Sequence, residues 1–255
     1  MNVLDVREVS VSYGSISIIE SISFSIKERE WLMIVGPNGS GKSTTIHAIT
    51  RGAPYTGIVR FEGRDISTYT SMELAKQTGV LMQDHVVGYS FTVEEIVRLG
   101  RYAYSKGLFS SFSDEDEEKV KRALELTGMH AVKEQSVLTL SGGELQRTFL
   151  AQIFAQDPKL LILDEPTNHL DLVYQKQIFE LIRDWIARTG RSVISVVHDL
   201  SLAKYYGTQI LLLNKGRVVA LGSPHEVLTK EYLNDIYMMD VYEWMNIMLS
   251  QWKDG

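Results

Sequence analysis

The chain has 255 residues, of which 44% are hydrophobic and 23% are charged; its formal net charge is −6 and it has no cysteine. This length and composition support one large domain or one domain with a small subdomain, and the acidic balance without a basic run argues against nucleic-acid binding. The lack of cysteine excludes disulfides and thiolate metal sites. The apolar runs are too short to span a membrane and the first residues lack a signal-peptide profile, so we expect a cytosolic chain, able to be peripheral to a membrane.

The N-terminal part has the pattern of an antiparallel β layer. Residues 3–13 and 22–26 are rich in β-branched apolar side chains, and a Gly14-Ser15 break separates them. Tyr13 lies just before this break. On spacing alone it is a half-buried strand tyrosine or an aromatic ring that stacks on a base, and the local pattern favours the first interpretation.

A glycine-rich loop follows the apolar run 31–35 and precedes a helix-like segment, 45–49. In that context the backbone N–H groups of such a loop point at an anion, the lysine reaches outer phosphates and the hydroxyl after it ligates Mg²⁺. The pattern therefore predicts a nucleoside-triphosphate site. Its residues are Gly36, Pro37, Asn38, Gly39, Ser40, Gly41, Lys42, Ser43 and Thr44.

Two further strands are expected at residues 57–62 and 79–82, with a short helix at 71–76 between them. Gln83 follows the second of these strands. On its own, a glutamine in that position indicates only the polar end of a strand.

Residues 88–156 read as a helical insertion. Thr92 opens a helix expected to reach about residue 104, and Ser113 opens another with an acidic first turn, which we interpret as a solvated helix start and not as a metal site. Ser141, Gly142 and Gly143 begin a third helix, to about residue 155. Its paired glycines leave backbone N–H groups that can bind an anion, whose identity the local pattern does not determine.

A buried strand at residues 160–163 ends in two carboxylates, Asp164 and Glu165. An aspartate at a strand's carboxyl edge suits a Mg²⁺ ligand that acts through water, and the adjacent glutamate can polarise an attacking water. The alternative is a pair of acids that cap a turn before Pro166. The phosphate loop upstream makes that alternative weaker.

The remainder alternates helix and strand. We expect a helix at 174–188, a strand at 192–197 that ends at His198, and a hairpin of 209–213 with 217–221. His198 is either structural or a contact to a γ-phosphate. The segment from residue 224 is expected to be helical, and we interpret its Met- and Trp-rich end as packing against its own domain or a sister chain.

Taken together, these motifs resemble the ATPases of ATP-binding cassette transporters over nearly the whole chain: the phosphate loop, Gln83, Leu-Ser-Gly-Gly-Glu at 140–144, Leu-Leu-Ile-Leu-Asp-Glu-Pro at 160–166, Asn-His-Leu-Asp at 168–171 and His198. The resemblance implies an α/β fold, a phosphate-loop NTPase core with a mixed, mainly parallel sheet, an N-terminal antiparallel β layer and an inserted helical subdomain. It implies one domain, 1–255, with a core at 1–87 and 157–230, a helical signature subdomain at 88–156 and a C-terminal helical tail at 231–255.

The resemblance also implies roles for single residues, with ATP and Mg²⁺ as ligands. Tyr13 would stack on adenine, against the local interpretation above. Gln83 would sense Mg²⁺ and water, and Asp164 would hold Mg²⁺. Glu165 would be the general base, and His198 would contact the γ-phosphate.

Other implied roles concern partner chains. Ser141, Gly142 and Gly143 would clamp the γ-phosphate held by a second copy of the chain, and Asp171 would communicate across the same interface. The active form would be a head-to-tail pair with two ATP molecules between the copies. It would act at the cytoplasmic face of the inner membrane on a separate permease and, indirectly, on a substrate-binding protein, without nucleic acid.

A finer resemblance, to importers of iron–siderophore, haem and cobalamin, covers residues 91–102, 164–171 and 197–203. Two departures are Ala103-Tyr104, where Pro-His often follows Gly-Arg-Tyr, and the tail from about Met238. Iron–siderophore is the first choice of cargo. The alternatives are a zinc or manganese importer, and a soluble cassette protein, which the single cassette and lack of a heptad run disfavour. The presence of Glu165 and His198 argues against a nonhydrolytic module.

Overall fold

The computed structural model describes residues 2–82, 88–104, 112–168 and 170–252. The chain forms two compact units. The first unit comprises Met1–Leu4, Ile26–Glu30 and Arg60–Ser195, and the second comprises Asp5–Ser25, Trp31–Val59 and Val196–Gly255. Within the described ranges, no helix has the length and apolar character needed to cross a bilayer.

Strands of the second unit surround the phosphate loop. β1 (Asn2–Tyr13) and β2 (Ile16–Lys27) are neighbouring strands joined at the predicted Gly14-Ser15 break. β3 (Trp31–Val35) is buried along its whole length and pairs in parallel with β9 (Gln209–Asn214), as expected for a strand covered on both faces. β9 pairs antiparallel with β10 (Arg217–Gly222), which confirms the predicted hairpin.

The hairpin turn has the backbone that its sequence favours. Lys215 and Gly216 both have positive φ values, 48° and 77°. Two successive positive φ values define the turn type whose twist matches a two-residue hairpin. Gly216 then donates its N–H to the Ser40 carbonyl at 3.1 Å, so the hairpin also supports the phosphate loop.

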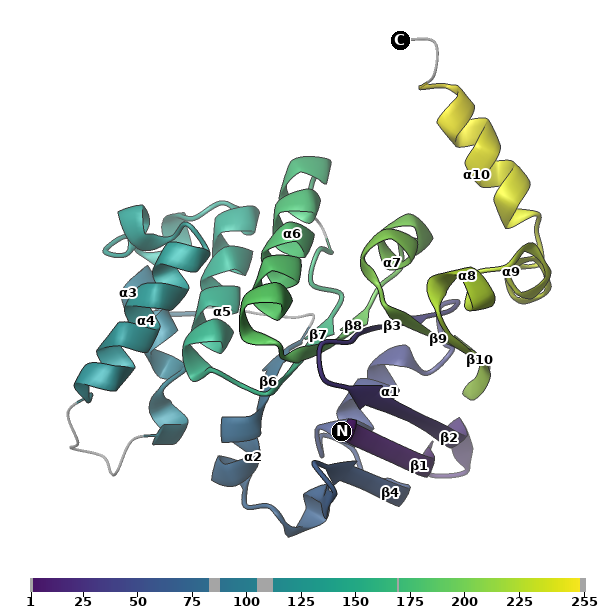
Figure 1. Cartoon of the computed structure of the whole chain (residues 1–255), viewed down its shortest axis with the longest axis horizontal. Coiled ribbons are helices and arrows are strands. Elements are labelled where there is room, and N and C mark those ends of the chain that lie inside the picture. Colours follow the sequence, from purple (N-terminus) through teal and green to yellow (C-terminus); the bar gives the residue numbers. More distant parts are fainter. Residues whose placement is uncertain (1, 83–87, 105–111, 169, 253–255) are drawn as a thin grey trace. The chain divides into compact units, whose positions relative to one another are not determined.

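Helices of the second unit are α1 (Lys42–Ile49), α7 (Leu200–Tyr206), α8 (Pro224–Val227), α9 (Lys230–Tyr237) and α10 (Val241–Ser250). The tail is therefore helical, as predicted. In Figure 1 the yellow α10 extends beyond α9 and away from the strands of its unit. β4 (Thr56–Phe61) begins in the second unit and ends in the first, and β5 (Arg64–Asp65) belongs to the first unit. The two strands pair antiparallel.

The first unit contains the strand that ends in the two carboxylates. β7 (Leu160–Asp164) is fully buried and pairs in parallel with β6 (Thr78–Leu81), with Leu81 opposite Leu163. α2 (Ser71–Gln77) leads into β6, and α6 (Leu172–Thr189) leads toward β8 (Ser192–Val196). The ring of Trp185 on α6 stacks on the ring of Phe154 in the preceding helix, with the two ring centroids 5.4 Å apart. This contact packs two elements of the core together.

Three helices of the first unit pack against one another: α3 (Val93–Leu99), α4 (Asp114–Leu126) and α5 (Gly142–Gln156). Figure 1 shows them side by side. Each begins with a capping box, Thr92 with Glu95, Ser113 with Asp116, and Ser141 with Glu144. The sequence patterns therefore located all three starts.

One helix end was predicted wrongly. The helix from Thr92 was expected to reach about residue 104, whereas α3 ends at Leu99 and a separate 3-10 turn covers Tyr102–Tyr104. After Leu99 the N–H groups of Gly100 and Arg101 bond the carbonyls three residues back, those of Val97 and Arg98, so the α-helical hydrogen-bond ladder gives way to 3-10 turns. A Cβ on Gly100 would lie 2.0 Å from the Gln152 carbonyl oxygen, so the chain passes close to the α5 backbone at this point.

Candidate nucleotide-binding site

The phosphate loop of the second unit connects β3 to α1 and depends on glycine at two positions of close approach. Gly36 has φ of 149°, and a Cβ built on it would lie 2.1 Å from the Leu213 carbonyl oxygen. Gly41 has φ of 98°, and its Cβ would lie 2.5 Å from a methyl carbon of Ile19. Because the obstacle at Gly36 is rigid backbone, no other residue fits there without moving β9.

The ammonium group of Lys42 lies folded over this loop. Its Nζ donates to the carbonyl oxygens of Gly36 at 2.9 Å and Pro37 at 3.0 Å, and the side chain is only 7% exposed. An ammonium group held over the loop favours an anionic ligand such as a polyphosphate.

Two features of the loop test whether a polyphosphate fits. Gly41, the N-cap residue of α1, has no side chain to cap the helix, which leaves the first N–H groups of α1 to other acceptors. The Ser40 hydroxyl is buried and has no hydrogen-bond partner among the described residues. A helix start with uncapped donors beside a buried cation fits phosphate oxygens.

Two other predicted site residues belong to the second unit. Tyr13, the last residue of β1, is 52% exposed, so its side chain is open to a ligand. His198 is exposed and lies between β8 and α7, and the adjacent Asp199 caps α7 by accepting from Ser201 N–H at 2.7 Å. The roles of Tyr13 and His198 toward ATP remain predictions.

The two predicted carboxylates of the first unit differ in their surroundings. Asp164, the last residue of β7, is 3% exposed, whereas Glu165 is partly exposed and has a positive φ of 51°. The side-chain amide of Asn168 donates to Glu165 Oε2 at 3.1 Å. A positive φ is uncommon for a glutamate, and it takes the backbone out of the extended conformation of β7 at this residue.

The turn after Glu165 is hydrogen-bonded to α5, called the signature helix here because it begins within the Leu-Ser-Gly-Gly-Glu motif. The side-chain amide of Gln146, one turn into α5, donates to the Pro166 carbonyl at 2.7 Å. Sequence reasoning gave Gln146 and Asn168 no role of their own. Their positions inside the two motifs, within a few residues of Ser141 and Glu165, are the signal that could have identified them.

The signature residues form a tightly packed helix start. The Ser141 hydroxyl accepts from Glu144 N–H at 3.3 Å. The Ser141 hydroxyl and the Ser141 N–H donate to the Glu144 carboxylate at 2.7 and 2.9 Å, and these two bonds hold the pKa of Glu144 below its usual value. A Cβ on Gly143 would lie 2.3 Å from the Tyr174 ring. Asp171 caps α6 by accepting from Tyr174 N–H at 3.0 Å, so it orients the element that carries this ring.

Two positions of the motifs, Gln83 and His169, lie outside the described residues. In the described ranges, no group of three or more His, Cys, Asp or Glu side chains could hold a metal by itself. Mg²⁺ prefers to combine one or two protein oxygens with phosphate oxygens and water. The Ser43 hydroxyl and the Asp164 carboxylate are oxygen donors of that kind.

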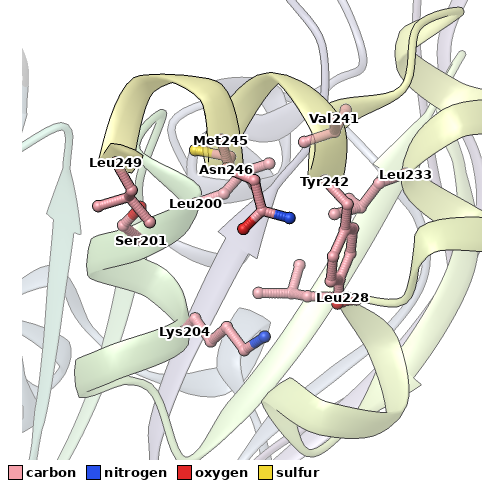
Figure 2. A pocket seen from close by; sticks show the side chains of 10 residues that line it. All are labelled: Leu200, Ser201, Lys204, Leu228, Leu233, Val241, Tyr242, Met245, Asn246 and Leu249. Carbon is pink, nitrogen blue, oxygen red and sulfur yellow. The ribbon is translucent and has the colours of Figure 1, made fainter. Parts of the chain in front are cut away.

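A separate cavity of about 210 Å³ lies in the second unit under α10. Figure 2 shows Tyr242 and Met245 of α10 facing Leu200 and Lys204 of α7 across it. None of the predicted site residues lines this cavity. The Tyr242 hydroxyl donates to the Leu228 carbonyl at 2.5 Å and fixes the start of α10.

The glycine loop, the buried lysine and the strand ending in an aspartate define a phosphate-loop NTPase. Residues 19–168 match the ABC transporter family, so the chain belongs to this family and carries its ATP-binding ATPase domain. This match confirms the predicted family, and the fold class is confirmed as well.

Individual relatives agree with this assignment. The chain is 36% identical over 232 residues to the ferric enterobactin transport ATP-binding protein of Escherichia coli, covering 91% of this chain and 85% of that protein. It is 35% identical over 241 residues to the iron(3+)-hydroxamate import ATP-binding protein of Bacillus subtilis, covering 94% and 89%. An uncharacterized ABC transporter ATP-binding protein of Bacillus subtilis is longer: the 38% identical match covers 91% of this chain and 53% of that relative.

The fold also matches solved structures. cbiO1 from Clostridium perfringens, part of an ABC transporter complex, superposes with a TM-score of 0.81 at 26% identity, covering 97% of this chain and 98% of that one.

Proposed function

We propose that this chain is the ATP-hydrolysing subunit of an importer that takes up an iron–siderophore or haem-type complex through a separate permease. The observation that carries the proposal is the connection of two motifs in the first unit, where Gln146 of the signature helix bonds the turn directly after Glu165. In this proposal, that hydrogen bond links the turn of the general base to the helix that recognises a second nucleotide. The names of the ferric enterobactin and iron-hydroxamate relatives support the choice of cargo.

In this proposal the phosphate loop binds and orients ATP. Lys42 neutralises the outer phosphates, and the N–H groups at the start of α1 surround their oxygens. Ser43 and Asp164 would hold Mg²⁺, which would neutralise charge on the phosphates as the bond to the terminal phosphate breaks. The ring of Tyr13 stacks on the base.

Glu165 acts as the general base toward the attacking water. Its carboxylate is oriented by the Asn168 amide and by a left-handed backbone, both of which fix the group before water arrives. Gln83 orients the same water and Mg²⁺, and His198 contacts the γ-phosphate. Catalysis then depends on positioning and on charge stabilisation in an in-line displacement.

The active form is a head-to-tail pair of chains. Ser141, Gly142 and Gly143 of one copy face the γ-phosphate bound by its partner, and Asp171 orients the adjoining helix. ATP closes the pair and hydrolysis opens it, which drives the permease between two access states. The chain therefore works at the cytoplasmic face of the inner membrane, together with the permease and its binding protein.

The test uses a tagged Glu165→Gln variant, which loses the base but keeps the phosphate loop. We expect it to bind ATP, to hydrolyse it at least about a hundredfold more slowly, and to form a stable dimer. With ATP and Mg²⁺ it should recover a polytopic permease from solubilised native membranes, whereas Lys42→Ala, as the matched control, should not. Near wild-type hydrolysis by Glu165→Gln would refute the role of the glutamate. Recovery of ribosomes or assembly factors in place of a permease would refute the importer.

A further inference from the structure

The cavity between α7 and α10, named here the α10 cavity, has a lining that is mainly apolar. Leu228, Leu233 and Val241 line it and are themselves buried. Its volume of about 210 Å³ corresponds to roughly seven water molecules, or to one ligand with roughly eight carbon atoms. An apolar space of this size suits the apolar body of one small molecule.

The start of α10 is fixed by hydrogen bonds at the edge of this cavity. The Tyr242 hydroxyl donates to the Leu228 carbonyl at 2.5 Å, and the Val241 N–H donates to the Asn234 side-chain oxygen at 3.1 Å. These bonds join α10 to α9 and to the residue after α8. The α10 cavity is therefore formed without a ligand, which lowers the conformational cost of binding one.

The charge of the lining has one sign. Among the described residues that line the α10 cavity, Lys204 alone is charged, and no carboxylate is one of them. Its ammonium group lies 5.5 Å from the centre of the Tyr242 ring (Figure 2). The exposed side chains of Ser201 and Asn246 supply further hydrogen-bond donors. An apolar space beside one cation is complementary to an amphipathic anion.

We propose that the α10 cavity binds a small monocarboxylate with a chain of about six to ten carbon atoms, whose carboxylate pairs with Lys204. An alkylammonium ion would meet a like charge, and a dicarboxylate would place its second charge among leucines. The bound ligand joins α10 to α7, the helix that starts two residues after His198. The inference does not depend on the proposed function, since binding requires no nucleotide.

The test is titration calorimetry of the full chain without nucleotide, with straight-chain carboxylates from butanoate to dodecanoate. We expect the dissociation constant to fall about fourfold for each added methylene and to level off near eight carbon atoms, where the cavity is full. Octanoate should bind about fivefold or more tightly than octanol, and octylammonium should bind more weakly than both. Octanoate should also slow amide hydrogen exchange in peptides 200–206 and 241–250.

Two variants separate the charge from the space. Lys204→Met keeps the stem without the ammonium group, and it should weaken octanoate about fivefold or more while octanol binds as before. Asn246→Phe places a ring in the cavity from an exposed position, and it should weaken both ligands. Lys121→Met is the matched control, because Lys121 is an exposed lysine of α4 that does not line the cavity. It should change nothing.

Three results would overturn the inference. The first is octanoate binding that both Lys204→Met and Asn246→Phe leave intact. The second is an affinity that keeps rising through dodecanoate, because binding is then to the exposed apolar surface and not to a cavity of limited size. The third is a lack of octanoate binding together with a dimer that Asn246→Phe dissociates in sedimentation, since a second copy of the chain is then the occupant.

Discussion

Substitution of Gly143 tests directly how tightly the start of α5 packs against the Tyr174 ring. In Gly143→Ala the added methyl carbon would lie 2.3, 2.5 and 2.7 Å from three carbons of the Tyr174 ring. Asp171 fixes the Tyr174 backbone and the Arg147 guanidinium lies 5.7 Å from the ring centre, so only a rotation of the partly exposed ring could relieve this contact. Its neighbour is a matched control: in Gly142→Ala the nearest atom is a Leu170 methyl at 3.8 Å, an ordinary contact.

The magnitude follows from comparing the two variants. Both replace glycine by alanine at adjacent positions of one helix start, so the backbone entropy gained by alanine, about 0.5–1 kcal/mol, is similar in each and cancels in the difference. What remains is the cost of overpacking, about 1–3 kcal/mol. We therefore expect the free energy of unfolding of Gly143→Ala to be about 1–3 kcal/mol lower than that of Gly142→Ala. This difference corresponds to a Tm that is roughly 2–12 °C lower.

The assay is urea and thermal unfolding of both variants, followed by the same comparison in a Tyr174→Ala background. Removal of the ring should abolish the difference between the two glycine positions, since the obstacle is then gone. Equal stabilities of Gly142→Ala and Gly143→Ala with the ring present would refute the reasoning. A difference that persists without the ring would show that contacts other than Tyr174 cause it.

Two further predictions concern charged groups. Lys42→Ala should weaken ATP binding at least tenfold in titration calorimetry, because the loop loses its buried cation, whereas exposed Lys176→Ala should leave it unchanged. For Asp116, burial raises the pKa, but hydrogen bonds from Ser113 and Arg101 outweigh it and hold the pKa below its ordinary value of 3.8. A lowered folded-state pKa stabilises the fold above the unfolded pKa and loses this contribution as the pH falls through the folded value. Asp116→Asn should therefore destabilise strongly at pH 7, on the order of 3 kcal/mol, and progressively less below pH about 4 in urea unfolding, whereas a pH-independent cost would contradict the ion pair.

The sequence by itself determined those features that depend on local chemistry. The starts of α3, α4 and α5 were predicted from Thr92 with its capping box, from Ser113 with its acidic first turn, and from Ser141 as an N-cap. In the structure all three are capping boxes. The hairpin at Lys215 followed from its glycine. The phosphate loop followed from a spacing that few other loops share.

The tertiary structure decided what depends on contacts between distant residues. No local pattern shows that Gly143 faces the Tyr174 ring, or that Gly100 closely approaches the α5 backbone. Tyr104 read only as a departure from related importers, yet its hydroxyl bonds Gln156, 52 residues away in sequence. Such contacts are set by the packing of whole helices, which propensity and periodicity do not specify. The candidate site residues could therefore be predicted from the sequence, whereas the contacts that surround them were visible only in the fold.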